Sequence, residues 1–517
     1  MKKKYCGAAA VMCSMCLLLS SCSNGAGETA ETKFNRTGLP ITDEPVTLEI
    51  ACVRTGTSGP WGEMPFFKKL EEKTNVKINW REFPDPYKES VNLMFASQDF
   101  PDAMMRGAED AQVLGAAAAK NVISLNDLID KYAPRWKEVL EKDDYVRKVV
   151  TMPDGNIYSL PFIRMDENDY GMRDGWFINK DWLDKLGLDI PVTTDDFYNV
   201  LKAFRDASEN GTLPADIIPW YFRYNQTVGG QYDIFASFGS QDNSNHIMVE
   251  NGKVVSTMTK PESRDAIQYL HKLYSEGLIP GDVFTDDYAT YVKKRGSDPA
   301  VTGVNHGYYN AYPEHYAAFL PPAAPGVEKG LVRQQTTKVL RNQMIIFANN
   351  KYPEITMRWA DELADPDNSV QALYGMFGTH IEKQQDGKIR FLETQVPLSK
   401  TSPINYAPAN ITPSIISSLV LERSDKQRAE DYKNIYKNNT VSEDSLYPPV
   451  VFTEEQNAKI AQYTTQLNTY ISETVAKWIV SGGVEDDWDA FQKKLQSMKL
   501  KELLGIYQEA LDAFNKN

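Results

Sequence analysis

Cysteine and histidine are scarce in this chain of 517 residues, which contains five of each. The chain also lacks the motifs His-Glu-x-x-His and Gly-x-Ser-x-Gly, a phosphate-binding Gly-rich loop and the pattern Gly-x-Gly-x-x-Gly. The sequence therefore shows no recognised metalloprotease, serine hydrolase or nucleotide-binding signature. A pair of carboxylates, as a glycosidase uses, stays an open alternative because the 70 acidic residues offer many pairs.

The first 22 residues have the organisation of a secretory signal. Three lysines at positions 2–4 precede a short apolar stretch over 6–19, and small residues then lead to Cys22. The stretch is shorter than the ~20 apolar residues that a membrane-spanning helix needs. Its end, Leu19-Ser20-Ser21-Cys22, resembles the lipobox of bacterial lipoproteins. The resemblance implies cleavage before Cys22, a diacylglycerol thioether on its sulfur, and a protein held at the outer face of the cell membrane. The alternative is an ordinary signal peptide.

Cleavage before Cys22 leaves Cys52 as the one cysteine without lipid, which excludes internal disulfides and cysteine-based metal sites. Losing the three lysines changes the formal charge from −14 to −17. A surface this acidic disfavours nucleic acid and anionic lipid as partners. We expect a monomer attached to the membrane by its lipid.

Residues 22–45 are polar and small and read as a flexible tether, so the folded body is expected from Val46. Its length suits two or three domains, at roughly 150 residues each. Val46, Leu48, Ile50 and Cys52 alternate with other residues as in a strand, which predicts a buried, inert thiol at Cys52. Further strands are expected at 76–80, after a helix over 66–73, and at 344–348.

Several helices carry clear start signals. Thr193 precedes an apolar pattern through Phe204, Thr453 starts a longer helix, and Thr259 to Glu262 reads as a capping box. A last pair of helices is expected over 486–498 and 500–514. Strands separated by such helices predict an α/β fold with parallel sheets, covered by a helical C-terminal region.

Aromatic residues gather in short stretches that also contain Gly, Pro, Asn or Arg. The stretches are 59–62, 175–177, 219–224, 308–312 and 373–378. The CH face of a sugar can cover a ring in a loop, while polar neighbours bind its hydroxyls. The alternative is that each ring packs under its own loop. As a set, these stretches indicate a ligand pocket.

The segment Asp206-Ala207-Ser208-Glu209-Asn210-Gly211 matches the first half of a calcium loop, with Ser208 in place of a better ligand. The twelfth position, where an EF-hand loop has Glu, is Ile217. The two readings are a structural calcium site and a plain turn after the preceding helix. No other cofactor is expected.

Several motifs together resemble bacterial extracellular solute-binding proteins of family 1, the lipoproteins that serve sugar ABC importers. The similar segments are Lys73-Thr74-Asn75-Val76, Phe100-Pro101-Asp102, Asp154 to Pro161, Asn179 to Leu188, Leu273 to Ile279, Leu320-Pro321-Pro322 and Ile479 to Tyr507. The segment Asp181 to Leu188 is the most specific. Ser208 and two extra residues after Gly211 depart from the fuller calcium loop of that family.

The resemblance implies a two-lobed, type II binding-protein fold with a ligand cleft between the lobes. The first crossing is expected near 154–161 and the return near 291–303. The N-terminal lobe would then comprise 46–160 with 295–350, and the C-terminal lobe 161–294 with 351–517. By analogy, the ligand-binding residues would be Trp61, Trp176, Trp220, Tyr221, Tyr308, Tyr309, Tyr312 and Tyr374.

The sequence therefore predicts a lipid-anchored, non-catalytic receptor that delivers an oligosaccharide to the permease of an ABC importer. Two alternatives stay open. One is an exported, lipid-anchored enzyme that degrades polysaccharides, and the other is a receptor of the same fold for peptides or other solutes.

Overall fold

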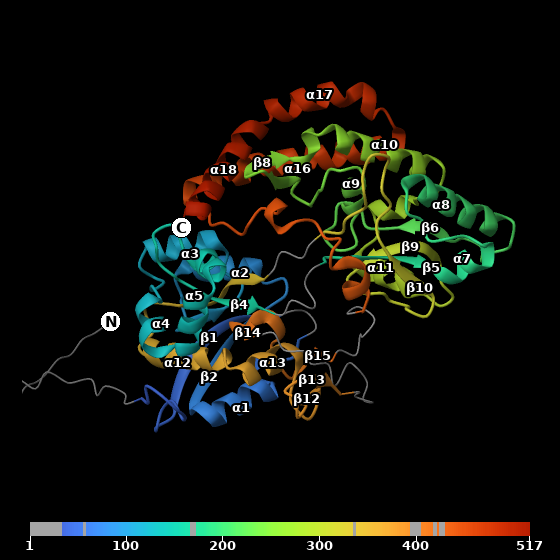
Figure 1. Ribbon diagram of the computed structural model, residues 1–517. Helices are drawn as coiled ribbons and strands as arrows, with labels where there is room; N and C mark the ends of the chain where they lie inside the picture. Colours follow the sequence, from blue (N-terminus) through green and yellow to red (C-terminus); the bar gives the residue numbers. More distant parts are fainter. Residues whose placement is uncertain are drawn as a thin grey trace, which may run out of the picture.

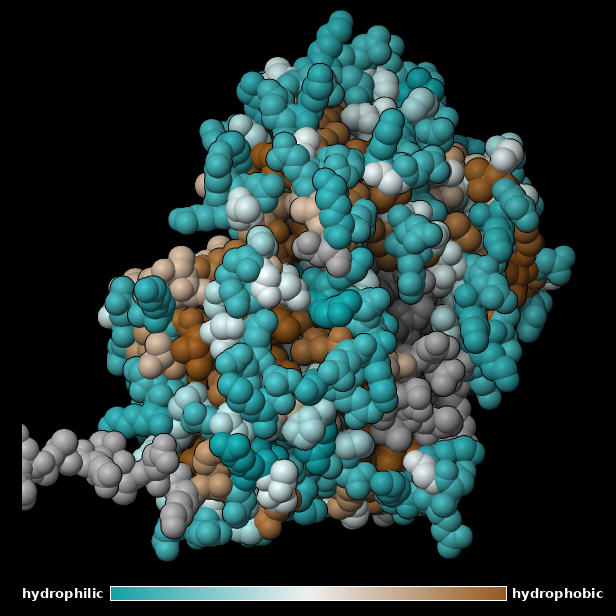
Figure 2. Space-filling model, turned by 60° about the vertical axis from the view of Figure 1, so that its left-hand side comes forward, coloured by the Kyte–Doolittle hydropathy of each residue, from teal (hydrophilic) through white to brown (hydrophobic). Residues whose placement is uncertain are grey.

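The computed structural model describes residues 34–54, 58–165, 172–333, 338–392, 405–416, 421–422 and 430–516. Cys22 and the expected signal segment lie outside the described residues. Within these ranges, no helix has the length and apolar character needed to cross a membrane. The visible face in Figure 2 is mostly hydrophilic, with hydrophobic residues in small groups.

The chain forms two lobes, each with its own hydrophobic core (Figure 1). The N-terminal lobe comprises 34–165 and 338–422, and the C-terminal lobe comprises 172–333 and 430–516, as far as these residues are described. The chain passes between the lobes between 165 and 172, between 333 and 338, and between 422 and 430. The two-lobed fold expected from the sequence is confirmed.

The N-terminal lobe contains a six-stranded sheet in which every strand except β11 runs in the same direction. In sheet order the strands are β14 (Ser414–Ile416), β4 (Leu160–Arg164), β11 (Val339–Ile346), β3 (Ala103–Met105), β1 (Val46–Arg54) and β2 (Val76–Pro84). Its helices are α1 (Pro65–Thr74), α2 (Lys88–Ser97), α3 (Asp110–Ala118), α4 (Asn126–Tyr132), α5 (Pro134–Lys142), α6 (Asp144–Val150), α12 (Pro353–Leu363) and α13 (Pro366–Tyr374). A small sheet of β12 (Ile381–Lys383), β13 (Ile389–Phe391) and β15 (Leu421–Glu422) lies beside it.

The C-terminal lobe contains a four-stranded sheet of β10 (Tyr316–Phe319), β5 (Gly175–Asn179), β9 (Thr302–Gly307) and β6 (Ile218–Tyr221). A hairpin of β7 (Ile247–Glu250) and β8 (Lys253–Ser256) lies apart from it. The helices are α7 (Lys180–Leu186), α8 (Thr194–Glu209), α9 (Asp233–Ser237), α10 (Pro261–Ser275), α11 (Tyr288–Arg295), α16 (Glu454–Ser481), α17 (Val484–Ser497) and α18 (Leu500–Lys516). Helices α16 to α18 arch over this lobe, and α18 ends beside the N-terminal lobe (Figure 1).

Most of the elements that the local sequence signals predict are present. Strand β1 buries Val46, Leu48 and Ile50, and the Cys52 thiol is buried, which raises its pKa well above the ordinary value. Capping boxes at Thr193 and Thr453 start α8 and α16 as expected. The expected box at Thr259 is wrong. Lys260 is the N-cap of α10, and the Thr259 hydroxyl donates to the carbonyl of Ser256 instead.

The boundaries between the lobes differ from the expected division. Strands β9 and β10, expected in the N-terminal lobe, pair with β5 in the C-terminal lobe. Helix α12, expected in the C-terminal lobe, buries Trp359 and Leu363 in the N-terminal core. The return passage therefore lies after Arg333, because β9 is held by β5 on one side and β6 on the other.

The folded body also includes residues before Val46, where the flexible tether was expected. Ile41 is fully buried, and its amide donates to the carbonyl of Thr74 over 2.9 Å. Arg358 of α12 donates to the carbonyl of Gly38 over 2.7 Å. Residues 34–42 therefore belong to the folded N-terminal lobe rather than to the expected tether over 22–45.

A buried ionic cluster in the C-terminal lobe connects the ends of two of the segments that pass between the lobes. Arg333 donates from Nε to Asp233 over 2.9 Å and from Nη2 to Asp174 over 3.0 Å, and both carboxylates are fully buried. The amide of Arg173 donates to the carbonyl of Arg333 over 2.7 Å. Asp174 directly follows the first passage and Arg333 directly precedes the second, so the cluster fixes both chain ends at one place.

We predict that Arg333→Met lowers the free energy of unfolding by about 3–5 kcal/mol, since it leaves two buried carboxylates without their cation. Urea unfolding of the mature chain measures the loss. The control is Lys131→Met, which breaks an exposed pair with Asp127 and should leave the midpoint unchanged. Equal midpoints for the two variants would contradict the role of the cluster.

Candidate functional site

The directions of the strands determine which edge of each sheet faces the other lobe. The first passage enters β5 at Gly175, and Gly307 at the end of β9 lies directly opposite. Strand β6 runs parallel to β9, so its last residue, Tyr221, lies at the same end. In Figure 1, α11 lies on this side of the lobe, toward the N-terminal lobe. We call this end the interlobe edge of the C-terminal lobe.

The interlobe edge of the N-terminal lobe consists of the carboxyl ends of β1, β2, β3 and β4, because β4 leads into the first passage. In open α/β sheets, ligands bind outside the carboxyl ends of the strands. Polar groups lie there in pairs: Arg54 contacts Glu82 at 3.4 Å, and Arg106 donates to Asn410 over 3.4 Å. The backbone amide of Trp61 also donates to Glu82, over 2.8 Å.

Four of the eight aromatic residues predicted to bind a ligand are fully buried: Trp61, Trp176, Trp220 and Tyr221. Trp61 stacks on Phe67 with ring centroids 5.2 Å apart in the N-terminal core. The other three rings belong to the C-terminal core. Protein side chains cover all four rings, so none presents an exposed face at an interlobe edge in this structure. A ligand contact by these rings stays a prediction.

The other four aromatic residues lie in different places. Tyr309 follows β9 at the interlobe edge and is 46% exposed, and Tyr308 beside it is half-buried. Tyr374 accepts a hydrogen bond over 2.9 Å from Arg164, the last residue of β4, on the opposite lobe. Tyr312 stacks on His315, which pairs with Asp181 of α7 at the far end of the sheet. The structure therefore brings Tyr308, Tyr309 and Tyr374 to the interlobe edges.

His306 connects the buried rings of the C-terminal lobe. Its imidazole stacks on Trp176 with centroids 4.0 Å apart, and its Nε2 accepts from the indole of Trp220 over 2.8 Å. Its Nδ1 donates to the carbonyl of Gly230 over 3.2 Å, so the two partners select one neutral tautomer. Burial lowers the pKa of His306 to about 3. His306 is therefore a core residue that stays neutral at physiological pH.

Two residues of the C-terminal interlobe edge, Tyr288 and Arg223, were not among the residues predicted from the sequence. Tyr288, at the start of α11, is 55% exposed, and the guanidinium carbon of Arg223 lies 5.4 Å from its ring centroid. Arg223 closes the aromatic stretch 219–224, so that stretch contained the signal for it. Tyr288 lies outside the aromatic stretches that the sequence singled out, and only the fold shows its exposure.

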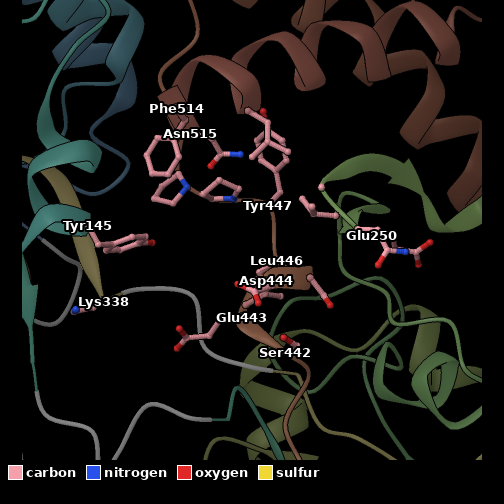
Figure 3. A pocket seen from close by; sticks show the side chains of 17 residues that line it. Tyr145, Glu250, Lys338, Ser442, Glu443, Asp444, Leu446, Tyr447, Phe514 and Asn515 are labelled. Atoms are coloured by element: carbon pink, nitrogen blue, oxygen red, sulfur yellow. The ribbon is translucent and has the colours of Figure 1, made fainter. Parts of the chain in front are cut away.

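A cavity of about 990 Å³ also lies between the lobes. Figure 3 shows Tyr145 and Lys338 of the N-terminal lobe on one side of it, and Glu250 on the other. The segment 442–449 and the end of α18 complete its lining, and the ring of Phe514 meets that of Tyr145 at 6.5 Å. None of the eight predicted ligand-binding residues lines this cavity. Because both lobes line it, its size depends on their relative position.

The comparisons with known proteins identify the family. Residues 55–370 match the family model described as bacterial extracellular solute-binding protein. The fructooligosaccharide ABC transporter substrate-binding protein FusA of Streptococcus pneumoniae is 31% identical over 100% of this chain and 99% of its own length. This chain belongs to the bacterial extracellular solute-binding proteins.

Solved structures agree with this assignment. The FusA structure in complex with kestose superposes with a TM-score of 0.79, at 31% identity, over 91% of this chain and 100% of the other. An HMO-binding solute-binding protein from Bifidobacterium longum infantis gives a TM-score of 0.82 at 25% identity, over 91% of this chain and 99% of the other. The type II fold expected from the sequence is therefore confirmed.

One solved structure is described as a FusA EF-hand mutant, which raises the question of calcium at 206–211 in this chain. Here Asp206 and Ser208 lie inside α8, where residues two positions apart face different sides and cannot converge on one ion. Arg205 donates to Asp206 from Nε over 2.9 Å and from Nη2 over 2.7 Å. Asn210 Oδ1 accepts from the amide of Thr212 over 3.0 Å. The residues present do not fit a calcium loop, and no cluster of three acidic, His or Cys ligands occurs in the part of the chain that the structure describes.

We predict that the melting temperature of the mature chain is the same in millimolar Ca²⁺ and in EGTA. The reason is that Arg205 already supplies the positive charge beside Asp206. Differential scanning calorimetry measures the two temperatures, with Asp206→Asn as the matched control. A rise with Ca²⁺ in the native chain that Asp206→Asn abolishes would show that the loop binds the ion.

A second prediction concerns pH. The unfolded chain protonates His306 near pH 6.5, whereas the folded chain keeps it neutral down to about pH 3. Between these values the unfolded state binds one more proton, so stability falls as pH falls. From pH 7 to pH 5, the free energy of unfolding of the native chain should fall by about 2 kcal/mol because of His306. The His306→Gln variant should not show this part of the decrease. Urea titrations of both proteins at the two pH values measure the difference, and an equal loss in both would contradict the buried neutral state.

Proposed function

We propose that this chain is the non-enzymatic receptor of an ABC importer, and that it captures an oligosaccharide between its lobes. The observation that carries the proposal is the full-length similarity to FusA, at 31% identity. Its relatives are described as substrate-binding proteins of transporters, and one was solved with kestose. We therefore place short fructooligosaccharides first among the candidate ligands.

The receptor would be exported and held at the outer face of the cell membrane by a lipid on Cys22. Its permease would recognise the closed form, in which both interlobe edges contact the ligand. Support comes from the two separate cores, which allow each lobe to move as a body. The chain would act as a monomer, with permease subunits as its partners.

The binding surface would use residues of the two interlobe edges. On the C-terminal lobe these are Tyr308 and Tyr309, and on the N-terminal lobe Arg106, Glu82 and Tyr374. Tyr309 is 46% exposed at the C-terminal interlobe edge, and the guanidinium carbon of Arg295 lies 5.8 Å from its ring centroid. The CH face of a sugar would cover the exposed part of this ring.

We expect a fructooligosaccharide such as kestose to raise the melting temperature of the mature chain. A ligand that binds only the folded state adds about 2.7 kcal/mol at a hundredfold excess over Kd. Tyr309→Ala should weaken binding about tenfold through loss of stacking. The control is Tyr198→Ala, which removes a half-buried tyrosine on α8, outside the interlobe edges.

A thermal-shift screen against neutral and acidic oligosaccharides measures the effect, followed by chromatography of the sugar after incubation. Breakdown of the bound sugar would indicate an enzyme rather than a receptor. No shift with any oligosaccharide would contradict the proposal and leave peptides or other solutes as the ligand class.

A further inference from the structure

The C-terminal interlobe edge carries a layered arrangement of rings and guanidinium groups on α11 and the segment after β6. Tyr291 is fully buried and donates its hydroxyl to the carbonyl of His306. The guanidinium carbon of Arg223 lies 5.8 Å from the ring centroid of Tyr291 and 5.4 Å from that of Tyr288. The order from the core outward is therefore a buried ring, a cation and an exposed ring.

Arg223 is held in place by its backbone and by these rings. Its amide donates to the carbonyl of Gly229 over 2.8 Å, which fixes the chain directly after β6. Cation–π contacts with two rings orient a planar guanidinium without using its hydrogen-bond donors. The donors of Arg223 therefore stay available in a fixed direction.

The guanidinium of Arg223 differs from its cationic neighbours in having no acceptor. Lys294 contacts Asp282 at 2.8 Å and Asp286 at 2.6 Å, and Arg295 donates to Asn305 over 3.0 Å. For Arg223, the described residues supply neither an ion pair nor a side-chain hydrogen bond, and its Nε is buried without a partner. The Nη groups are not among the buried atoms without a partner, so they are the donors of Arg223 that stay open to an acceptor oxygen of a ligand.

The carboxylate that caps α11 is already engaged. Asp287 is the N-cap of the helix, and its side chain accepts from the amide of Thr290 over 2.8 Å. The pKa of Asp287 is lowered chiefly by this backbone hydrogen bond, with a smaller effect of Arg223. Asp287 is thus committed to the helix, and the donors of Arg223 are open to another group.

We propose that Tyr288 and Arg223 form a sugar subsite on the C-terminal interlobe edge, an inference that rests on the proposed receptor function. The ring of Tyr288 stacks on the CH face of one sugar unit, and Arg223 donates to an oxygen of the same unit or the next. The ligand must offer an acceptor oxygen beside a sugar ring. A hydroxyl of a neutral sugar and a carboxylate of an acidic sugar both provide it.

The test is isothermal titration of the mature chain with the oligosaccharide that gives the largest thermal shift. Tyr288→Ala and Arg223→Gln are each expected to raise Kd about tenfold or more, without lowering the melting temperature of the unliganded protein. If the increase in Kd of Arg223→Gln becomes smaller with added salt, the ligand group is a carboxylate. If the increase does not depend on salt, the ligand group is a hydroxyl.

The matched controls come from a second stacked pair on the same lobe. Lys272 Nζ lies 3.6 Å from the ring centroid of Tyr198, on helices α8 and α10 away from the interlobe edge. Tyr198→Ala and Lys272→Gln should leave Kd unchanged. If Tyr288→Ala and Arg223→Gln bind the sugar as tightly as these controls, the subsite is overturned while the receptor function stands. If the native chain binds no oligosaccharide, the receptor function itself fails.

Discussion

The geometry of the space between the lobes depends on the buried cluster of Asp174, Arg333 and Asp233. Two passages between the lobes start from this cluster, because Asp174 follows the first passage and Arg333 precedes the second. A guanidinium with two carboxylates in a protein interior tolerates little displacement, since each broken contact leaves a charge without a partner. Both interlobe segments are therefore held rigidly at one place on the C-terminal lobe.

The same cluster connects the passages to the aromatic core. Asp233 accepts from the indole of Trp176 over 3.0 Å, and Trp176 stacks on His306, which in turn accepts from Trp220. These groups satisfy one another's polar atoms, so the rings can be buried completely. The buried rings of the stretches 175–177 and 219–224 therefore help to hold the interlobe edge in place. Tyr288 and Tyr309 remain exposed at that edge, which the buried core supports.

The sequence predicted the local elements well and the division into lobes poorly. Strand β1 and helices α8 and α16 follow from alternation, apolar periodicity and capping residues, which act within a few positions. The division failed at β9, which pairs with β5 and β6 far away in the sequence. It failed again at α12, whose apolar face packs on the first lobe. Neither the strand pairing of β9 nor the packing of α12 on the N-terminal lobe can be seen in the residues close by in the sequence.

The candidate site shows the same limit. The stretch of rings at 308–312 reads as uniform in the sequence, yet Tyr309 lies at the interlobe edge and Tyr312 stacks on His315 at the far end of the sheet. The calcium-like segment 206–211 keeps its residue types, but α8 continues through Asp206 and Ser208 and turns them apart. In both cases the residue types alone did not show where the fold places the side chains.

By itself, the sequence determined the resemblance to solute-binding proteins and the local helices and strands, and it predicts an export signal with a lipobox-like end. These properties reside in short segments, where neighbouring residues decide the outcome. The tertiary structure alone decided which strands share a sheet, where the chain passes between the lobes, and which rings are buried. Burial of a ring depends on what the rest of the chain packs against it, and for Trp176 and Trp220 that partner is His306, more than 80 residues further along the chain.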